Sequence, residues 1–229
     1  MAGEIKDVII WGAGALGEHV HYLFSYDPNV RVRAFLDDNP DQAGKLFHDL
    51  PVLPAVENSF AQLRKEGVTH AIAAIGDGPV REQCSLRLKE SGYEITNAVH
   101  PSAQISPQVQ LGQGVIILAN VNLFFNSVLG DNVFVANSVT VSHDNQIDDN
   151  VSLNTSCTIV ARVHVGRNVY VGASATVVHP HIGSISVGED AIIGAGSLII
   201  ENVPARAVVH GVPGKVVRYR IADADGWLV

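Results

Sequence analysis

The sequence is poor in the features that mark several specialised classes of protein. Its 229 residues include 2 cysteines, 1 methionine and 15 Lys and Arg residues, against 23 Asp and Glu residues. The formal charge of −8 argues against nucleic acid as a partner, because there is no basic stripe to release counterions from phosphates. Cys84 and Cys157 provide neither a disulfide framework nor a metal-binding spacing, so both are expected to be small buried hydrophobes.

Long hydrophobic runs are missing as well. No stretch of 18 or more apolar residues occurs, so no transmembrane helix is expected. The first residues, MAGEIKDVIIWGAG, carry acids and lead straight into a strand and a glycine turn, which is not typical of a signal peptide. The composition, 47% hydrophobic and 17% charged, is sufficient for a real core. The sequence therefore predicts a soluble, cytoplasmic, folded protein with no membrane partner.

The first part of the chain, residues 1–97, alternates segments typical of strands and of helices. Strands are expected at 7–11, 30–38, 70–77 and 93–99, and helices at 15–25, 55–67 and 79–92. This alternation predicts an α/β domain with a small, open, mostly parallel sheet and helices on both faces. The domain is about half the size of a full dinucleotide-binding fold.

A glycine-rich turn follows the first expected strand. Gly12, Gly14 and Gly17 form G-x-G-x-x-G, and Asp37 falls where the ribose-binding acid of an NAD enzyme belongs. Such a turn before a helix cradles any phosphate, however, because its amides and the helix dipole are indifferent to what the phosphate carries. Three interpretations stay open at this point: an NAD site, a nucleotide-sugar site and a purely structural turn. Asp37 and Asp38 are candidates for a ribose or base contact, or simply end the strand in a turn.

From residue 98 onward the sequence repeats with a period of six. Starting at Val99 and ending at Val177, fourteen successive sixth residues are Ile, Leu or Val. A four-residue insertion in VVHPHIGSIS interrupts the register, which resumes at Val187. The position four residues after each aliphatic is mostly small or Val, and Cys157 falls in this set.

This repeat predicts a hexapeptide β-helix over residues 98–229. Each hexad makes one short strand and a turn, and three hexads make one coil of a triangular prism. Coils stack at the strand spacing of about 4.8 Å, and the aliphatic columns form the core. The final stretch, ENVPARAVVHGVPGKVVRYR, breaks the repeat and is expected to close the end of the prism.

Taken together, these motifs resemble a known family. Hexad coils ending in IIGAGS…VP…GVPGK, a small Rossmann-like domain before them and a VSHD segment in mid-prism are similar to the PglD/NeuD-like bacterial sugar acetyltransferases. The resemblance implies a left-handed parallel β-helix, a homotrimer, and acetyl-CoA between adjacent prisms. It also implies that Gly12, Gly14, Ala15, Gly17, Asp37 and Asp38 face a nucleotide-linked sugar rather than NAD.

The resemblance further implies an active site in the prism. Acetyl transfer to an amine or hydroxyl needs a base, a donor to the oxyanion and substrates held in line. His143 matches the family's general base, and Asp144 is a candidate to fix its tautomer and stabilise the imidazolium. Ala161 lies three hexads further on, so its N–H is a candidate oxyanion donor one coil away. No cysteine or serine nucleophile is called for, which favours direct attack.

Other positions match the family's acetyl-CoA site, and no metal is expected. The pairs Gly172-Ala173 and Gly194-Ala195 match loops whose amides face the pantetheine arm, where small residues allow close approach. Glycine also follows the aliphatic in many hexads, so these pairs have a purely structural interpretation too. Lys215, in GVPGK, is a candidate partner for a CoA phosphate or else a solvated surface lysine.

The chain departs from the family pattern at three places. Ser152 stands where close members have a second histidine, nine residues after the base. Ala15-Leu16 stands where many members have Gly-His in the first loop, which weakens the prediction of the acceptor more than that of the reaction. The insertion carries His179 and His181, expected in a polar surface loop, with metal ligation as the alternative.

Competing functions differ in what they require. A carbonic anhydrase on the same prism commonly has two metal-binding histidines five residues apart, but Asp148 follows His143 at that spacing. A passive β-helix scaffold or ice-binding surface requires a regular ladder of Thr or apolar residues on one flat face. The outer positions of this sequence are instead of mixed type and include charged residues. Among acetyltransferases, the amino group of a nucleotide-linked amino sugar is the favoured acceptor. O-acetylation of sialic acid or of another glycan hydroxyl is the alternative.

Overall fold

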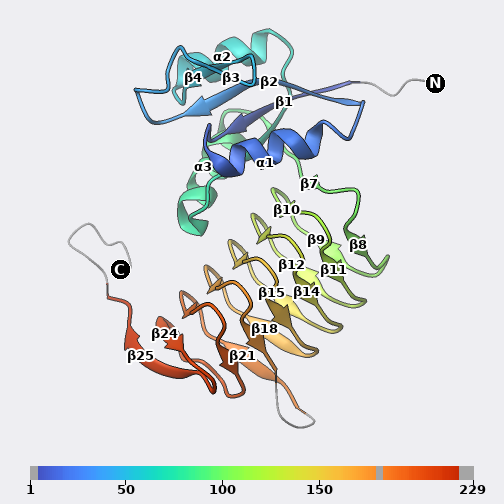
Figure 1. The fold of residues 1–229 in the computed structure, drawn as a ribbon. Coiled ribbons are helices and arrows are strands. Elements are labelled where there is room, and N and C mark those ends of the chain that lie inside the picture. The colour runs from blue at the N-terminus through green and yellow to red at the C-terminus, as the bar shows by residue number, and fades with distance from the viewer. Residues whose placement is uncertain (1–4, 179–182, 222–229) are drawn as a thin grey trace. The chain divides into compact units, whose positions relative to one another are not determined.

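The computed structural model describes residues 5–178 and 183–221. The chain forms two compact units, Met1–Val99 and His100–Val229. The sequence predicted the boundary between them after residue 97. Within the described ranges, no helix has the length and apolar character needed to cross a membrane. Figure 1 traces the chain through both units, which are described separately below.

The first unit is a six-stranded sheet in the order β3-β4-β2-β1-β5-β6. Its strands are β1 (Lys6–Trp11), β2 (Val30–Asp37), β3 (Leu46–Phe47), β4 (Leu50–Pro54), β5 (His70–Ala73) and β6 (Glu94–Ile95). All neighbours pair in parallel except β3 and β4, which form an antiparallel hairpin. Three helices connect the strands: α1 (Ala15–Phe24), α2 (Glu57–Lys65) and α3 (Gly78–Glu90). This is the expected Rossmann-like sheet.

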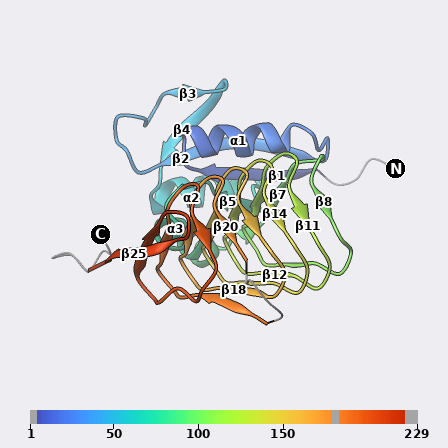
Figure 2. The same cartoon turned by 60° about the horizontal axis from the view of Figure 1, so that its bottom comes forward.

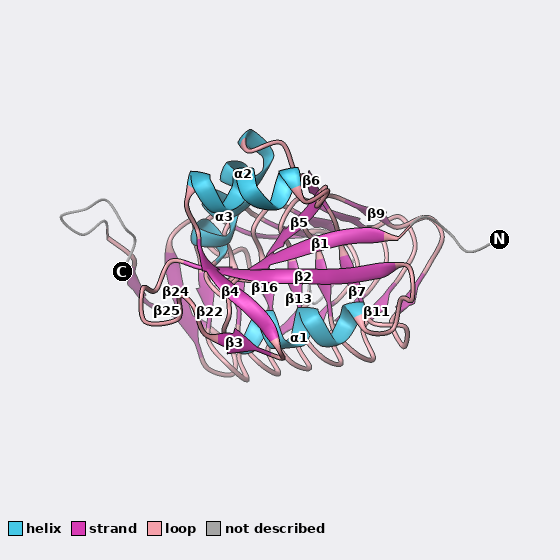
Figure 3. Ribbon diagram, turned by 90° about the horizontal axis from the view of Figure 1, so that it is seen from above, coloured by secondary structure: helices cyan, strands magenta, loops and turns pink. Residues whose placement is uncertain are grey.

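Both faces of this sheet are covered, as continuous apolar strands require. In Figure 3, α1 lies on one side of β1 and β2, and α2 and α3 lie on the other. The α2 and α3 side is held by a core in which Trp11 packs against Phe60, with 5.5 Å between ring centroids. The start of α3 is fixed by Asp77, whose carboxylate accepts the Val80 N–H.

The sequence does not predict the β3–β4 hairpin. Its turn residues, His48 and Asp49, have φ values of 49° and 60°, where a hairpin usually has Asn-Gly. Pro51 and Pro54 lie in β4, and proline normally argues against a strand. The segment expected as one strand at 93–99 is also divided. It forms β6 and then β7 (Ala98–Val99), which joins the first sheet of the prism.

The second unit is a left-handed parallel β-helix with three sheets of short strands, as the hexads predict. The first sheet, here face C, contains β7, β10 (Ile116–Ile117), β13 (Phe134–Val135), β16 (Ser152–Leu153), β19 (Tyr170–Val171), β22 (Ile192–Ile193), β24 (Ala207–His210) and β25 (Lys215–Tyr219). The second, face D, contains β8 (Gln104–Ile105), β11 (Asn122–Leu123), β14 (Thr140–Val141), β17 (Thr158–Ile159), β20 (Thr176–Val177) and β23 (Leu198–Ile199). The third, face E, contains β9 (Gln110–Leu111), β12 (Val128–Leu129), β15 (Gln146–Ile147), β18 (Val163–Val165) and β21 (Ile185–Val187).

The coils are stacked side by side, as Figure 2 shows. Each strand pairs in parallel with the equivalent strand of the next coil, for example Leu123 with Val141. The strand after the four-residue insertion keeps this pairing, since His164 of β18 pairs with Ser186 of β21. His179 and His181, in that insertion, lie outside the described residues. The inward aliphatics form one buried core running along the prism.

The corners of the prism explain the polar residues of the repeat. A residue at each corner has a φ of about 60°, the left-handed region that Asn, Asp and Gly tolerate best. Asn120, Asn126, Asn132, Ser138 and Asp144 are successive examples, one in each hexad. The hexad therefore combines an aliphatic that must be buried with a corner residue that must accept a positive φ.

Both cysteines are free and buried, as expected. Burial raises the pKa of the Cys84 thiol and of the Cys157 thiol to about 12. Such thiols stay protonated at neutral pH, so neither cysteine is a nucleophile.

Candidate active site

A histidine–aspartate pair lies at the corner between faces D and E. The Nδ1 atom of His143 lies 2.7 Å from Oδ2 of Asp144. This contact and a hydrogen bond from Asn126 hold the pKa of the Asp144 carboxyl below its ordinary value. An ionised carboxylate only accepts hydrogen bonds, so Nδ1 is the donor in this contact, and in the neutral imidazole Nε2 is the nitrogen with the lone pair. The pair thus presents a basic nitrogen from a side chain that is 37% exposed.

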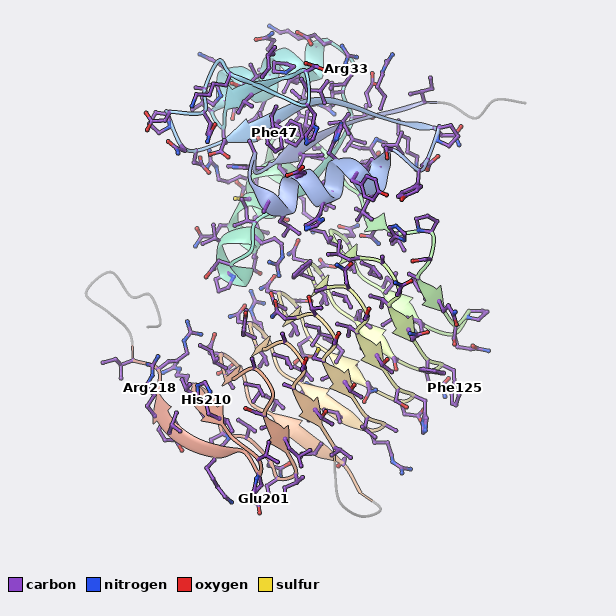
Figure 4. The ribbon with its side chains drawn as sticks, in the orientation of Figure 1. Arg33, Phe47, Phe125, Glu201, His210 and Arg218 are labelled. Atoms are coloured by element: carbon purple, nitrogen blue, oxygen red, sulfur yellow. The ribbon has the colours of Figure 1, made fainter. Side chains whose placement is uncertain are left out.

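Two residues of the preceding coil hold this pair in place. The ring of Phe125 stacks on the His143 ring, with 5.0 Å between centroids and 8° between planes. The Nδ2 atom of Asn126 donates to Oδ1 of Asp144 at 3.0 Å. Figure 4 shows Phe125 at the outer edge of the coils. Sequence analysis missed both residues, although they precede His143 and Asp144 by one full coil of the repeat.

Ala161 follows His143 by one coil. Its side chain is buried, and the neighbouring Arg162 N–H donates to the His143 carbonyl at 3.2 Å. Within the described residues, the Ala161 N–H donates to no other group. An amide that is available to a ligand at this position has the character required of an oxyanion donor.

The two glycine–alanine pairs stack on each other at the corner between faces C and D. The amides of Gly172 and Gly194 donate to Ile193 and Val209 at 2.8 Å each, so both serve the coil ladder. A Cβ on Gly172 would lie 2.5 Å from the Ala195 nitrogen, which explains the need for glycine. Ala173 and Ala195 are exposed, and among the described residues their N–H groups have no partner. Of these four residues, Ala173 and Ala195 are the two whose backbone amides are available to a ligand.

Lys215 begins β25, the antiparallel strand that closes the prism. Its side chain is exposed, and no ion pair forms with it in the part of the chain that the structure describes. Figure 4 shows Arg218 on the same strand and His210 on its neighbour β24. The ammonium group is thus free to meet a phosphate.

The glycine turn of the first unit brings backbone segments into close contact at two of its glycines. Gly12 has a φ of 122°, and a Cβ there would lie 2.6 Å from the Ala74 oxygen. Gly17 packs still closer, since its Cβ would lie 1.9 Å from the Gly12 oxygen. Gly14 caps α1 without a side-chain hydrogen bond, so the first-turn amides from Ala15 onward point out of the helix.

The two aspartates that follow β2 have different partners. Both oxygens of Asp37 accept backbone N–H groups, from Ala13 at 2.9 Å and from Asn39 at 2.8 Å, so this residue shapes the turn. Asp38 accepts from the Trp11 indole at 3.0 Å and is 61% exposed. Of the two, Asp38 is the one available to a ligand.

Other candidates lie elsewhere. Ser152 is buried on β16 of face C, whereas His143 follows a face D strand. Within residues 5–178 and 183–221, no three His, Cys, Asp or Glu side chains gather in a geometry that holds a metal.

The fold and the site together define a hexapeptide-repeat β-helix protein with a Rossmann-like N-terminal domain and an exposed His–Asp pair. Residues 7–88 match the PglD N-terminal domain. A UDP-N-acetylbacillosamine N-acetyltransferase of Bacillus subtilis is 29% identical over 117 residues, covering 50% of this chain and 52% of the relative. The chain therefore spans about half the length of this curated relative.

Two solved structures match over more of the chain. PerB from Caulobacter crescentus, in complex with CoA and GDP-perosamine, is 28% identical with a TM-score of 0.85, covering 93% of this chain and 98% of PerB. The acetyltransferase domain of PglB from Neisseria gonorrhoeae, in complex with acetyl coenzyme A, is 26% identical with a TM-score of 0.83, covering 93% of this chain and 100% of that domain. The chain is thus similar in sequence and fold to PglD-type sugar acetyltransferases, and the resemblance drawn from the sequence is confirmed.

Proposed function

We propose that the protein is an acetyl-CoA-dependent N-acetyltransferase that acts on the amino group of a nucleotide-linked amino sugar. The observation that carries this proposal is the His143–Asp144 pair, whose 2.7 Å contact leaves Nε2 as an exposed base. The relatives support it. PerB binds both CoA and GDP-perosamine, and the Bacillus subtilis relative is named for acetylating a UDP-linked sugar.

In this reaction His143 Nε2 takes the proton that the amino group loses as its nitrogen attacks. Asp144 stabilises the resulting imidazolium, and the proton then passes to the departing sulfur. The Ala161 N–H donates to the carbonyl oxygen as negative charge develops there. Acetyl-CoA, when bound, supplies the thioester. One bond to nitrogen forms, one bond to sulfur breaks, and no covalent enzyme intermediate is needed.

The acetyl-CoA site fits the residues at the prism corner. We assign the pantetheine arm to the exposed surface formed by Ala173 and Ala195. Beside them, Gly172 and Gly194 allow the coils to pack closely. Lys215 is assigned to a CoA phosphate as a point charge. A homotrimer is part of this proposal, since the family resemblance implies a site between adjacent prisms.

The first domain, residues 1–97, is assigned to the nucleotide-linked sugar, and residues 98–229 to acetyl transfer. The turn at Gly12, Gly14, Ala15 and Gly17 would receive the diphosphate, and Asp38 a ribose or base. The relatives favour a nucleotide-linked sugar over NAD, since PerB is described in complex with GDP-perosamine.

O-acetylation of a sialic acid or glycan hydroxyl is the alternative activity, because the same base serves a hydroxyl. The relatives named above favour an amine, since both PerB and the Bacillus subtilis protein are described with amino-sugar nucleotides. A passive scaffold is the non-enzymatic alternative, and it gives no reason for the His143–Asp144 pair.

A thermal-shift panel of acetyl-CoA, UDP, GDP, dTDP, CMP and NAD tests the proposal. A ligand at a hundred times its Kd stabilises the native state by about 2.7 kcal/mol. Stabilisation by acetyl-CoA and one nucleoside diphosphate is expected, followed by N-acetylated product in mass spectrometry with the matching amino sugar. Stabilisation by CMP with acetyl-CoA would favour O-acetylation. Stabilisation by NAD alone, or by no ligand in the panel, would refute the proposal.

A further inference from the structure

A groove on face D, at the N-terminal end of the prism, plays no part in the chemistry described above. Its volume is about 230 Å³, and it lies between β8 and β11. Four side chains point away from the core along its walls: Gln104, Ser106, Asn122 and Phe124. Ile105 and Leu123 complete its lining.

Backbone N–H groups along this groove are used within the coil ladder. The N–H groups of Gln104, Ser106 and Phe124 donate to Val121, Leu123 and Val141 of the next coil, at 2.8–3.0 Å. In contrast, the side chains of Gln104 and Ser106 have no hydrogen-bond partner among the described residues. The Asn122 amide donates to the Asn120 carbonyl at 3.3 Å, which leaves its own oxygen to accept.

The chemistry of the walls suits a sugar ring. Phe124 is 44% exposed and offers an aromatic face for the C–H side of a pyranose, while amides and a hydroxyl offer both donors and acceptors. The groove is smaller than the roughly 300–1,000 Å³ of pockets for drug-sized ligands, so it fits one ring rather than a nucleotide.

The groove also adjoins the catalytic corner. Phe124 is followed directly by Phe125, whose ring stacks on His143 at 5.0 Å. In register, Asn122 lies beside Thr140, the strand residue that leads into the His143 corner. A ring held against Phe124 is therefore held one residue from the group that contacts the base.

We propose that this groove binds the ring of the acceptor amino sugar, with Phe124 as its platform and Asn122, Gln104 and Ser106 as its hydrogen-bonding partners. This inference rests on the proposed function. It assigns acceptor recognition to the prism itself and leaves the nucleotide to the first domain.

Steady-state kinetics of Phe124→Ala and Asn122→Ala test the assignment, with the nucleotide sugar that the wild type acetylates. Each variant is expected to raise the KM for the nucleotide sugar about tenfold, because it loses one aromatic or polar contact. The KM for acetyl-CoA is expected to stay unchanged. Tyr170→Ala is the matched control, because Tyr170 is an aromatic residue of 45% exposure on face C. Unchanged KM values in both groove variants would overturn the groove assignment and leave the proposed function standing.

If the wild type acetylates no nucleotide sugar, the proposed function is refuted. A binding measurement then still tests the groove assignment by itself. Saturation-transfer NMR with GDP-perosamine then reports on the groove directly. Saturation transfer to the sugar protons would support the groove as a sugar site if Phe124→Ala abolishes the transfer and Tyr170→Ala preserves it. Absence of transfer to the sugar protons in the wild type would overturn it.

Discussion

The ring of Phe125 lies nearly parallel to the ring of His143, at 5.0 Å between centroids and 8° between planes. The two residues occupy equivalent places in successive coils, so the stacking of those coils brings them together. This contact fixes the plane of the imidazole, while Asp144 fixes its rotation through Nδ1. Phe125 is therefore a positioning residue for the proposed base.

Phe125→Leu should lower kcat about three- to tenfold with little change in either KM, because the ring of His143 then samples unproductive orientations. Phe125→Tyr should restore most of the activity, since it keeps the stacked ring. The measurement is steady-state kinetics with both substrates varied. A parallel loss in the Leu and Tyr variants would contradict a stacking role.

His143→Ala should reduce kcat by about 10²–10⁴, the usual contribution of a general base. The matched control is His164→Ala. His164 also contacts a carboxylate, Asp148 at 2.8 Å, and it is 53% exposed on face E. Near-normal turnover of His143→Ala, or an equal loss in His164→Ala, would remove His143 from the mechanism.

Asp144→Asn should lower kcat about 10- to 100-fold, the typical effect of removing the partner that orients a functional histidine. Steady-state kinetics with both substrates varied is the measurement. Because the pKa of Asp144 lies below its ordinary value of 3.8, the wild-type carboxylate is ionised across the assayed range.

Asn126→Ala provides the companion measurement, because Asn126 donates to the second oxygen of Asp144. A smaller loss of kcat is expected, because the charge of Asp144 stays intact. A loss of kcat as large as that of Asp144→Asn would argue against a role for that charge.

Gly17→Ala should destabilise the first unit by several kcal/mol, although alanine is favoured over glycine in a helix by about 1 kcal/mol. The added Cβ would lie 1.9 Å from the Gly12 oxygen, so the glycine turn and α1 must separate. Gly76→Ala is the control, since no atom lies within 4 Å of its Cβ position. Urea unfolding of both variants gives the comparison, and equal midpoints would show that the turn yields without cost.

The sequence by itself determined the prism and the alternation of strands and helices in the first unit. Every sixth residue from Val99 to Val177 is aliphatic, and those from Ile117 onward lie in one buried core, so a local period specifies the global fold. The strands β1 and β2 are likewise readable, because each is largely apolar, with Gly12 directly after β1 and Asp37 at the end of β2. The position of His143 next to Asp144 was also readable, because neighbours at a corner share one turn.

The tertiary structure decided what depends on contacts between coils or between strands. Asp37 accepts two backbone N–H groups and so shapes the turn after β2, and no sequence pattern reports that. Gly172 and Gly194 serve the coil ladder, which a family motif cannot distinguish from cofactor contact. The β3–β4 hairpin is hidden by its prolines, and Phe125 gains its role only when the coil period places it on His143. Sequence periodicity fixes which residues face inward, whereas side-chain orientation across a coil follows from packing, and packing is not a local property.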